Sequence, residues 1–173
     1  MGRWATRLDK RPAAANHWAV PEVRTRGVDA LLEAARQRIE RVAPEVAWVE
    51  ASSGEALIVD LRSSDERRRH GIVPGSVHVP RSVLEWRADP TSEWRNRHLE
   101  GPGRLLLLCG EGFSSSLAAA SVADLGHGRA GDVVGGFEAW RAAGLPVSAA
   151  PADEAGARAG MGAPDPGAIA LTD

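Results

Sequence analysis

Apolar residues lie along this chain in short runs that alternate with stretches of helical spacing. Nearly unbroken runs occur at residues 56–61, 104–108 and 133–134. Continuous rather than alternating apolar residues are typical of parallel strands that are buried on both faces of a sheet. Each run therefore predicts a buried strand, and the third predicts the end of one.

Helical patterns separate these runs. Apolar residues recur every three or four positions from Val28 to Val42, which predicts an amphipathic helix over this segment. Further helices are predicted at residues 44–51, 65–69, 82–87, 115–125 and 137–143. Such alternation favours an α/β fold with a mostly parallel central sheet and helices on both faces. Ligands bind at the carboxyl ends of the strands in sheets of this kind.

Composition divides the chain into a core and two extensions. Residues 27–148 contain the predicted elements and are expected to fold as one domain, which a chain of 173 residues can accommodate. Residues 1–26 have no hydrophobic period and predict an extended or flexible arm. Residues 149–173 are rich in alanine, glycine and proline, a composition that cannot bury a core and predicts a flexible tail.

Charge and cysteine content narrow the classes of function. A formal net charge of -2 gives no reason to expect nucleic acid or a membrane surface as a partner. No stretch has membrane-spanning or signal-peptide character, so we expect a cytoplasmic protein. A single cysteine excludes an internal disulfide. No group of Cys and His residues has the spacing of a zinc site, so we expect no metal.

Cys109 directly follows the predicted strand 104–108 and opens a loop that leads into a helix. The loop residues are Gly110, Glu111, Gly112, Phe113, Ser114 and Ser115. Backbone amides and a helix N-terminus around the sulfur would favour a thiolate, the nucleophilic form of cysteine. The alternative is that Cys109 is a small core residue and the loop only joins a strand to a helix. Its place at the end of a strand favours the reactive interpretation.

Charged and aromatic residues outside the loop have structural and functional interpretations. Asp60 is expected to accept backbone hydrogen bonds at the end of its strand, and the role of Arg62 is left open. Trp86 and Arg87 could line a pocket, or they could belong to an amphipathic helix with Trp86 half buried. The arginines at 67–69 predict a solvated helix face.

Four segments, in their order along the chain, resemble the rhodanese domain, the fold of the sulfurtransferases. They are Leu57–Arg62 with its Asp-x-Arg ending, the turn Gly71–Ser76, the loop Cys109–Ser115, and one closing segment made of Val133–Trp140 together with Gly144–Val147. Each motif is short, but the ordered set is specific and spans more than half of the chain.

The resemblance implies a sulfurtransferase. Cys109 would accept a sulfane sulfur from a small donor such as thiosulfate, hold it as a persulfide, and pass it to a thiophilic acceptor, either a small molecule or a protein thiol. The amides of residues 110–115 would stabilise the outer sulfur of the persulfide. The resemblance implies no metal or organic cofactor.

The loop departs from the family pattern in its charge. Ser114 stands where many members carry arginine, and Glu111 adds a negative charge. Thiosulfate is a dianion, and the loop offers no cation to attract it unless Arg62, Arg81 or Arg87 reaches the pocket. We therefore expect weak turnover of thiosulfate and a preference for a less charged sulfane or a protein persulfide.

Two other functions compete with sulfur transfer. A cysteine-dependent phosphatase or arsenate reductase needs an arginine after five intervening residues, and Ser115 occupies that position here, which disfavours this reading. A catalytically weak rhodanese-like module could instead bind a partner or sense oxidants through Cys109. The missing loop arginine supports such a module, whereas the presence of Cys109 and both loop glycines opposes it.

Overall fold

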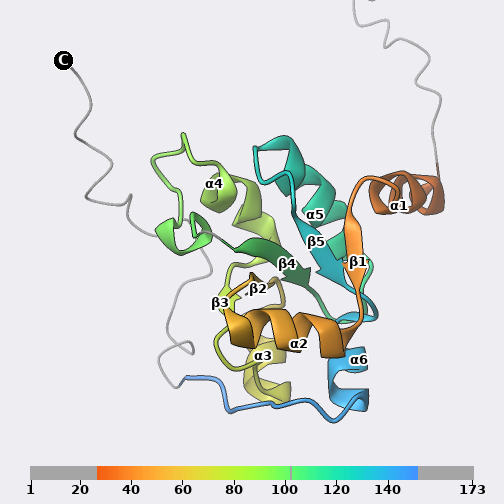
Figure 1. Ribbon diagram of the computed structural model, residues 1–173, viewed down its shortest axis with the longest axis vertical. Coiled ribbons are helices and arrows are strands. Elements are labelled where there is room, and N and C mark those ends of the chain that lie inside the picture. Colours follow the sequence, from red (N-terminus) through yellow and green to blue (C-terminus); the bar gives the residue numbers. More distant parts are fainter. Residues whose placement is uncertain (1–26, 102, 152–173) are drawn as a thin grey trace, which may run out of the picture.

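The computed structural model describes residues 27–101 and 103–151, which form a parallel sheet with helices on both faces (Figure 1). Over these residues the sheet has five strands in the order β1-β5-β4-β2-β3, and every neighbouring pair is parallel. The strands are β1 Glu40–Val42, β2 Ala56–Asp60, β3 Val77–His78, β4 Arg104–Leu108 and β5 Gly131–Val133. The predicted α/β class is confirmed. The predicted arm, residues 1–26, and residues 152–173 of the predicted tail lie outside the described residues.

The helices of the described residues occupy the segments between the strands. They are α1 Val28–Arg36, α2 Pro44–Ser53, α3 Ser64–His70, α4 Leu84–Ala88, α5 Ser114–Asp124 and α6 Gly136–Ala142, with 3-10 turns at Arg81–Val83 and Arg97–Leu99. Among these helices, none has both the length and the apolar character needed to cross a membrane.

Local chemistry explains where α3 begins. The Ser63 hydroxyl accepts a hydrogen bond from the Glu66 amide, and the Glu66 carboxylate accepts one from the Ser63 amide. This reciprocal arrangement satisfies two amides that would otherwise lack partners at the start of a helix. The cap fixes the side chain of Glu66 at the first turn of α3, beside the end of β2.

The core lies on both faces of β4, which explains its unbroken run of leucines. Leu105 and Leu107 pack in one apolar cluster with residues of α4 and α5. Leu106 and Leu108 pack in a second cluster, which includes residues of α2 and α6. Trp140 of α6 is fully buried in this second cluster. A strand covered on both faces needs apolar side chains in both directions.

The predicted helix from Val28 to Val42 is wrong in its second half. Helix α1 ends at Arg36, and residues 40–42 form the edge strand β1, which pairs with β5 (Figure 1). Ile39 packs against one core cluster and Val42 against the other. Residues three apart in an extended segment point to opposite faces. An extended chain therefore lets Ile39 and Val42 contact the two core clusters on opposite faces of the sheet. The helical spacing of these two residues was therefore coincidental.

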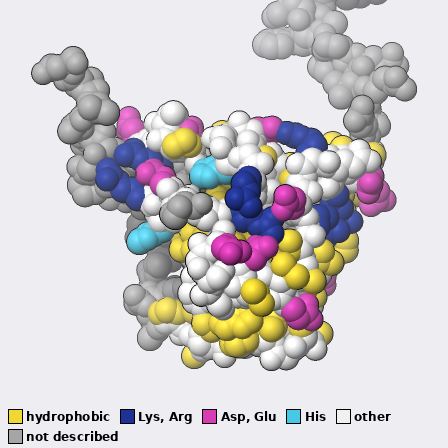
Figure 2. All heavy atoms as spheres, viewed as in Figure 1, with side chains coloured by type: hydrophobic (Ala, Val, Ile, Leu, Met, Phe, Trp, Pro, Cys, Tyr) yellow, Lys and Arg dark blue, Asp and Glu magenta, His cyan; other side chains and the backbone are white. Residues whose placement is uncertain are grey.

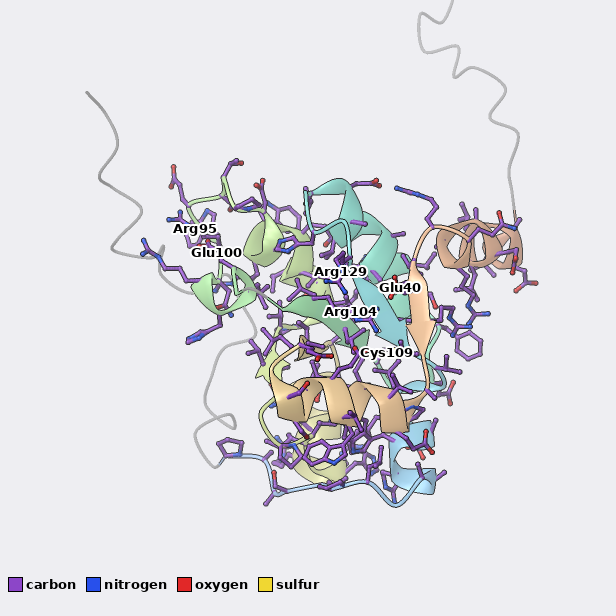
Figure 3. The ribbon with its side chains drawn as sticks, in the orientation of Figure 1. Glu40, Arg95, Glu100, Arg104, Cys109 and Arg129 are labelled. Carbon is purple, nitrogen blue, oxygen red and sulfur yellow. The ribbon has the colours of Figure 1, made fainter. Side chains whose placement is uncertain are left out.

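Basic and acidic side chains are interspersed on the face shown in Figure 2. Arg104, at the start of β4, forms ion pairs with Glu50 of α2, at 2.7 Å, and with Glu40 of β1 (Figure 3). These pairs tie the start of the central strand to its neighbours. Apolar side chains also gather on this face, and Val46 and Val49 of α2 are exposed.

Candidate active site at the carboxyl end of the sheet

Cys109 lies just beyond the carboxyl end of β4, a central strand of the sheet (Figure 3). The loop that follows turns sharply at Gly112, where φ is +77°, and enters α5 at Ser114. A Cβ atom at position 112 would lie only 2.6 Å from the Gly135 nitrogen. Both the backbone angle and this close approach require glycine, so Gly112 allows the loop to fold back over the sulfur.

Hydrogen-bond donors of the loop converge on the Cys109 sulfur. The Gly112 amide lies 3.2 Å from Sγ and the Ser115 amide 3.4 Å from it. The Ser115 hydroxyl oxygen is also 3.2 Å from Sγ. It can accept a hydrogen bond from the thiol or donate one to the thiolate, since a hydroxyl is both donor and acceptor. The loop therefore surrounds the sulfur with groups that stabilise negative charge.

Two opposing effects act on the pKa of the Cys109 thiol. Burial raises this pKa, because only 7% of the residue is exposed and a charged sulfur would lose hydration. Hydrogen bonds from the side chains of Ser114 and Ser115, and from the amides of Ser115 and Gly112, lower it. The hydrogen bonds prevail, and the pKa of Cys109 lies below its ordinary value. This direction agrees with the predicted effect of the loop amides.

A buried carboxylate, that of Asp132, contacts the first turn of the helix that follows the loop. Asp132 of β5 is fully buried, and its Oδ2 atom lies 2.6 Å from the Ser116 hydroxyl and 3.4 Å from the Ser115 hydroxyl. The other carboxylate oxygen accepts a hydrogen bond of 2.9 Å from Arg41 Nε. Asp132 thus holds the first turn of α5 against the sheet. Sequence reasoning missed it, although an aspartate beside a predicted buried run is the signal that could have found it.

Arg36, at the end of α1, holds the same loop from outside. Its Nη2 atom donates to the Gly112 carbonyl at 3.1 Å, and its Nε donates to the Ser116 hydroxyl at 3.3 Å. Its guanidinium carbon lies 5.8 Å from the centre of the Phe113 ring. These contacts tether the turn that donates the Gly112 amide to Cys109. No pattern in the sequence pointed to this contact.

Cys109 lines a pocket of about 390 Å³. The loop contributes Cys109, Gly110, Glu111, Phe113 and Ser114 to its lining. The remaining lining residues come from the segments around α3 and α6, namely Arg62, Glu66, His70, Phe137 and Glu138. The sulfur is thus recessed, yet it forms part of the wall of a cavity that could admit a small molecule.

Arg62 is one of the residues that line this pocket. Its Nε and Nη2 atoms donate to the Asp60 carboxylate at 3.0 and 2.7 Å, and Nη2 also donates to the Gly71 carbonyl at 2.9 Å. Its guanidinium carbon lies 3.4 Å from the centre of the Phe137 ring. Asp60 also accepts a hydrogen bond from the Arg62 amide, so the expected backbone contact is present.

Arg67 departs from the predicted solvated helix face. Its side chain is buried, and its Nη1 atom donates to Asp60 Oδ2 at 2.6 Å. Arg68 and Arg69 are exposed and pair with Asp65, as expected for a solvated face. Asp60 therefore orders both Arg62 and Arg67, a role that needs a carboxylate rather than any strand-ending residue.

Trp86 and Arg87 are not among the residues that line the pocket. Trp86 is 51% exposed on α4, and Arg87 donates from Nη1 to the Trp94 carbonyl at 2.8 Å. Arg81 pairs with Glu85 and does not line the pocket either. Of the arginines considered from the sequence, Arg62 alone reaches the described pocket. The structural alternative for Trp86 and Arg87, a partly exposed helix, is the arrangement found.

The sequence model of the Rhodanese-like domain matches residues 44–143, more than half of the chain. The chain belongs to the rhodanese-like family. The match begins at α2, so β1 and α1 lie before it, and with them Arg41 and Arg36. The resemblance noted in the four sequence motifs is thereby confirmed.

One curated relative and two solved structures are similar to this chain. The thiosulfate sulfurtransferase GlpE of Actinobacillus succinogenes is 29% identical over 110 residues, which cover 63% of this chain and 90% of that protein. A protein of unknown function from Rhodopseudomonas palustris, described as a possible tyrosine phosphatase, is 35% identical with a TM-score of 0.68. That alignment covers 74% of this chain and 98% of the other.

A thiosulfate sulfurtransferase from Pseudomonas aeruginosa has the same fold, with a TM-score of 0.55 and 22% identity. The alignment covers 72% of this chain but 23% of that protein, which is much longer. At this identity the likeness concerns the fold.

Proposed function

We propose that this protein is a sulfurtransferase that carries a sulfane sulfur as a persulfide on Cys109. The observation that supports the proposal most directly is the set of donors from Gly112 and Ser115 around Sγ in the wall of a pocket. A lowered thiol pKa provides the thiolate that attacks a donor. Membership of the rhodanese-like family and the likeness to GlpE are consistent with this chemistry.

The proposed reaction has two exchange steps. In the first, the Cys109 thiolate attacks the outer sulfur of the donor, an Sγ–S bond forms, and the sulfur bond of the donor breaks. The donor leaves as sulfite if it is thiosulfate, or as a thiolate if it is a persulfide. In the second, an acceptor nucleophile attacks the outer sulfur on Cys109, which leaves as a thiolate again. Amides of the loop would stabilise the negative charge of the persulfide between the steps.

Intact-mass spectrometry tests this proposal directly. After incubation with thiosulfate or with a low-molecular-weight persulfide, we expect the protein to gain the mass of one sulfur atom and to lose it again when an acceptor thiol is added. Cys109→Ser removes the one cysteine of the chain and should gain nothing. Absence of the adduct with every donor would contradict the proposal and favour the binding or redox-sensing module.

A phosphatase is the second candidate, because the Rhodopseudomonas palustris protein is described as a possible tyrosine phosphatase. The loop from residue 110 to residue 115 contains no arginine to clamp a phosphate. Glu66, Glu111 and Glu138 line the pocket and would repel a phosphate dianion. Sulfur transfer therefore suits the described residues better.

A further inference from the structure

The inner end of the pocket favours negative charge. The amides of Gly112 and Ser115 face the Cys109 sulfur. Arg62 lines the same pocket, is 3% exposed, and its Nη1 atom has no hydrogen-bond partner among the described residues. A buried donor without a partner is costly, and a ligand that carries negative charge can satisfy it. The geometry therefore suits an anionic sulfur at this end.

Three other lining residues have the opposite charge. Glu66, Glu111 and Glu138 all line the pocket and are exposed, and they come from three separate segments. The Oε1 atom of Glu66 lies 3.8 Å from the position that a Cβ would take at Gly110, directly after Cys109. Among the lining residues that the structure describes, Arg62 is the one arginine, and no lysine is present. The mouth is therefore acidic.

Neighbouring cations offset this acidic mouth only weakly. Among the described residues, Glu138 pairs with Arg141, whose Nη1 atom is 3.6 Å away, and both side chains are at least half exposed. Pairs of this kind are screened by water and salt. Glu66 is bound by the Ser63 amide and hydroxyl, which are neutral groups. Hydrogen bonds from Ser63, set against a smaller opposing effect of burial, keep the pKa of Glu66 below its ordinary value, so it is ionised at neutral pH.

We propose that the pocket selects sulfur donors whose carrier group bears an ammonium, that is, aminothiol persulfides. This inference rests on the proposed function. The outer sulfur of such a donor would face Cys109 and Arg62, and its ammonium would face the three glutamates. Thiosulfate has two negative charges and no positive one, so its sulfonate would meet the acidic mouth. At about 390 Å³ the pocket has the size of a small-molecule site.

The chemical step balances without any further reactant. The Cys109 thiolate attacks the outer sulfur of R–S–SH, and the new Sγ–S bond forms as the S–S bond of the donor breaks. The carrier leaves as the thiolate R–S⁻, and the transferred sulfur keeps its proton until solvent removes it. No electrons are gained or lost overall, because one sulfur–sulfur bond replaces another.

Three donors that differ only in the charge of the carrier test the inference. They are the persulfides of cysteamine, 2-mercaptoethanol and 3-mercaptopropionate, whose carriers are cationic, neutral and anionic. The measurement is the second-order rate of sulfur gain on Cys109, followed by mass spectrometry at low ionic strength. We expect the rate to fall in that order, by roughly tenfold from first to last. The Coulomb energy between unit charges a few ångströms apart in water corresponds to a change in rate of about this size. Raising the salt concentration should reduce the differences between the three rates, because salt screens the charges.

The double variant Glu111→Gln/Glu138→Gln shows whether the mouth is responsible. Glu66 is left intact because it caps α3. We expect the double variant to reduce the difference between cationic and anionic donors by roughly threefold or more. Glu45→Gln is the matched control, since Glu45 is exposed on α2 and does not line the pocket, and it should leave the order unchanged.

The outcomes separate this inference from the proposed function. If Cys109 gains sulfur from all three donors at equal rates, or fastest from the anionic one, charge selection is wrong while sulfur transfer stands. An order that persists unchanged in the double variant also overturns the inference. If none of the three persulfides modifies Cys109 but thiosulfate does, the inference is wrong and the proposed function stands. If thiosulfate also leaves Cys109 unmodified, the proposed function fails as well.

Discussion

Hydrogen bonds to the sulfur determine how readily the Cys109 thiol ionises. Desolvation opposes ionisation, since the residue is almost completely buried. Hydrogen bonds from the Ser114 and Ser115 side chains and from the Ser115 and Gly112 amides together outweigh it. The groups that lower this pKa are thus hydroxyl and amide dipoles of the loop. Removing one such donor should change reactivity without changing the fold.

The pH dependence of alkylation should reveal this effect. For the wild type, the rate of iodoacetamide reaction should rise with pH to a midpoint below that of an unperturbed cysteine thiol, since the pKa of Cys109 is lowered. Ser115→Ala removes a hydroxyl bond to the thiolate and should raise the midpoint by roughly one pH unit. A pH–rate profile measures both values.

Ser121→Ala is the control for this experiment. Ser121 lies on α5 like Ser115 but makes no contact with Cys109 among the described hydrogen bonds. Its midpoint should equal that of the wild type. A wild-type midpoint at or above that of free cysteine would show that burial, and not hydrogen bonding, prevails.

At the level of elements, the loop is held from two sides. Asp132 of β5 binds the first turn of α5, and Arg36 of α1 binds the Gly112 carbonyl. Arg36 lies outside the segment that matches the family model. An element added before the matched domain thus reaches the residue whose amide contacts the sulfur.

Arg36→Ala should loosen the loop without unfolding the protein. We expect sulfur gain by Cys109 to slow by roughly threefold to tenfold, because misplaced donors stabilise the negative sulfur less well. The unfolding free energy should fall by no more than about 1 kcal/mol, since the side chain is partly exposed. Single-turnover rates and urea unfolding measure these quantities.

Arg38→Ala provides the matched comparison for Arg36→Ala. Arg38 follows α1 and makes an exposed ion pair with Asp124, at the far end of α5 from the loop. Its removal should leave the rate of sulfur gain unchanged. Equal rates in both variants would mean that the tether has no role in reactivity.

At the level of the whole molecule, two apolar clusters hold the sheet between its helices. Trp140 is fully buried in one of them, its ring meets that of Trp48 edge-on at 6.0 Å, and its Nε1 donates to the Pro146 carbonyl at 3.0 Å. Position 140 therefore joins α6, α2 and the segment after α6. Substitution of Trp140 should therefore lower the stability of the whole domain.

Trp140→Ala should destabilise the fold by about 3–5 kcal/mol, the usual cost of emptying a large buried site. Trp86→Ala removes an equal side chain that is 51% exposed, and it should cost less than about 1 kcal/mol. Denaturant unfolding of the two variants measures the difference. Similar losses in both would contradict the burial found for these tryptophans.

Much of the fold and the centre of the site follow from neighbouring residues in the chain. The leucines of β4, the cap of α3 at Ser63 and the glycine turn before α5 are local signals, because each depends on residues within a few positions. They indicated a mostly parallel sheet and a loop that begins at Cys109, but neither the order of the strands nor the edge strand β1. The family motifs follow the same local segments.

Contacts between distant segments were not predictable in this way. Arg36, Asp132 and Arg67 looked like ordinary charged residues, and residues 40–42 looked like the end of a helix. Their roles depend on which strand lies beside which, and the placement of β1 against β5 brings Arg41 to Asp132. Trp86 and Arg87, close in sequence to pocket segments, were directed elsewhere by the packing of α4.

The chain order of apolar runs, turns and caps was therefore enough to specify an α/β sheet with a cysteine at the end of a central strand. The charge around that cysteine was decided only by the tertiary structure, which brings Glu66 and Glu138 beside the loop and the Arg62 guanidinium against the Phe137 ring. The physical reason is distance along the chain. Periodicity reports which side of an element is buried, whereas an electrostatic environment sums groups that meet only after the elements have packed.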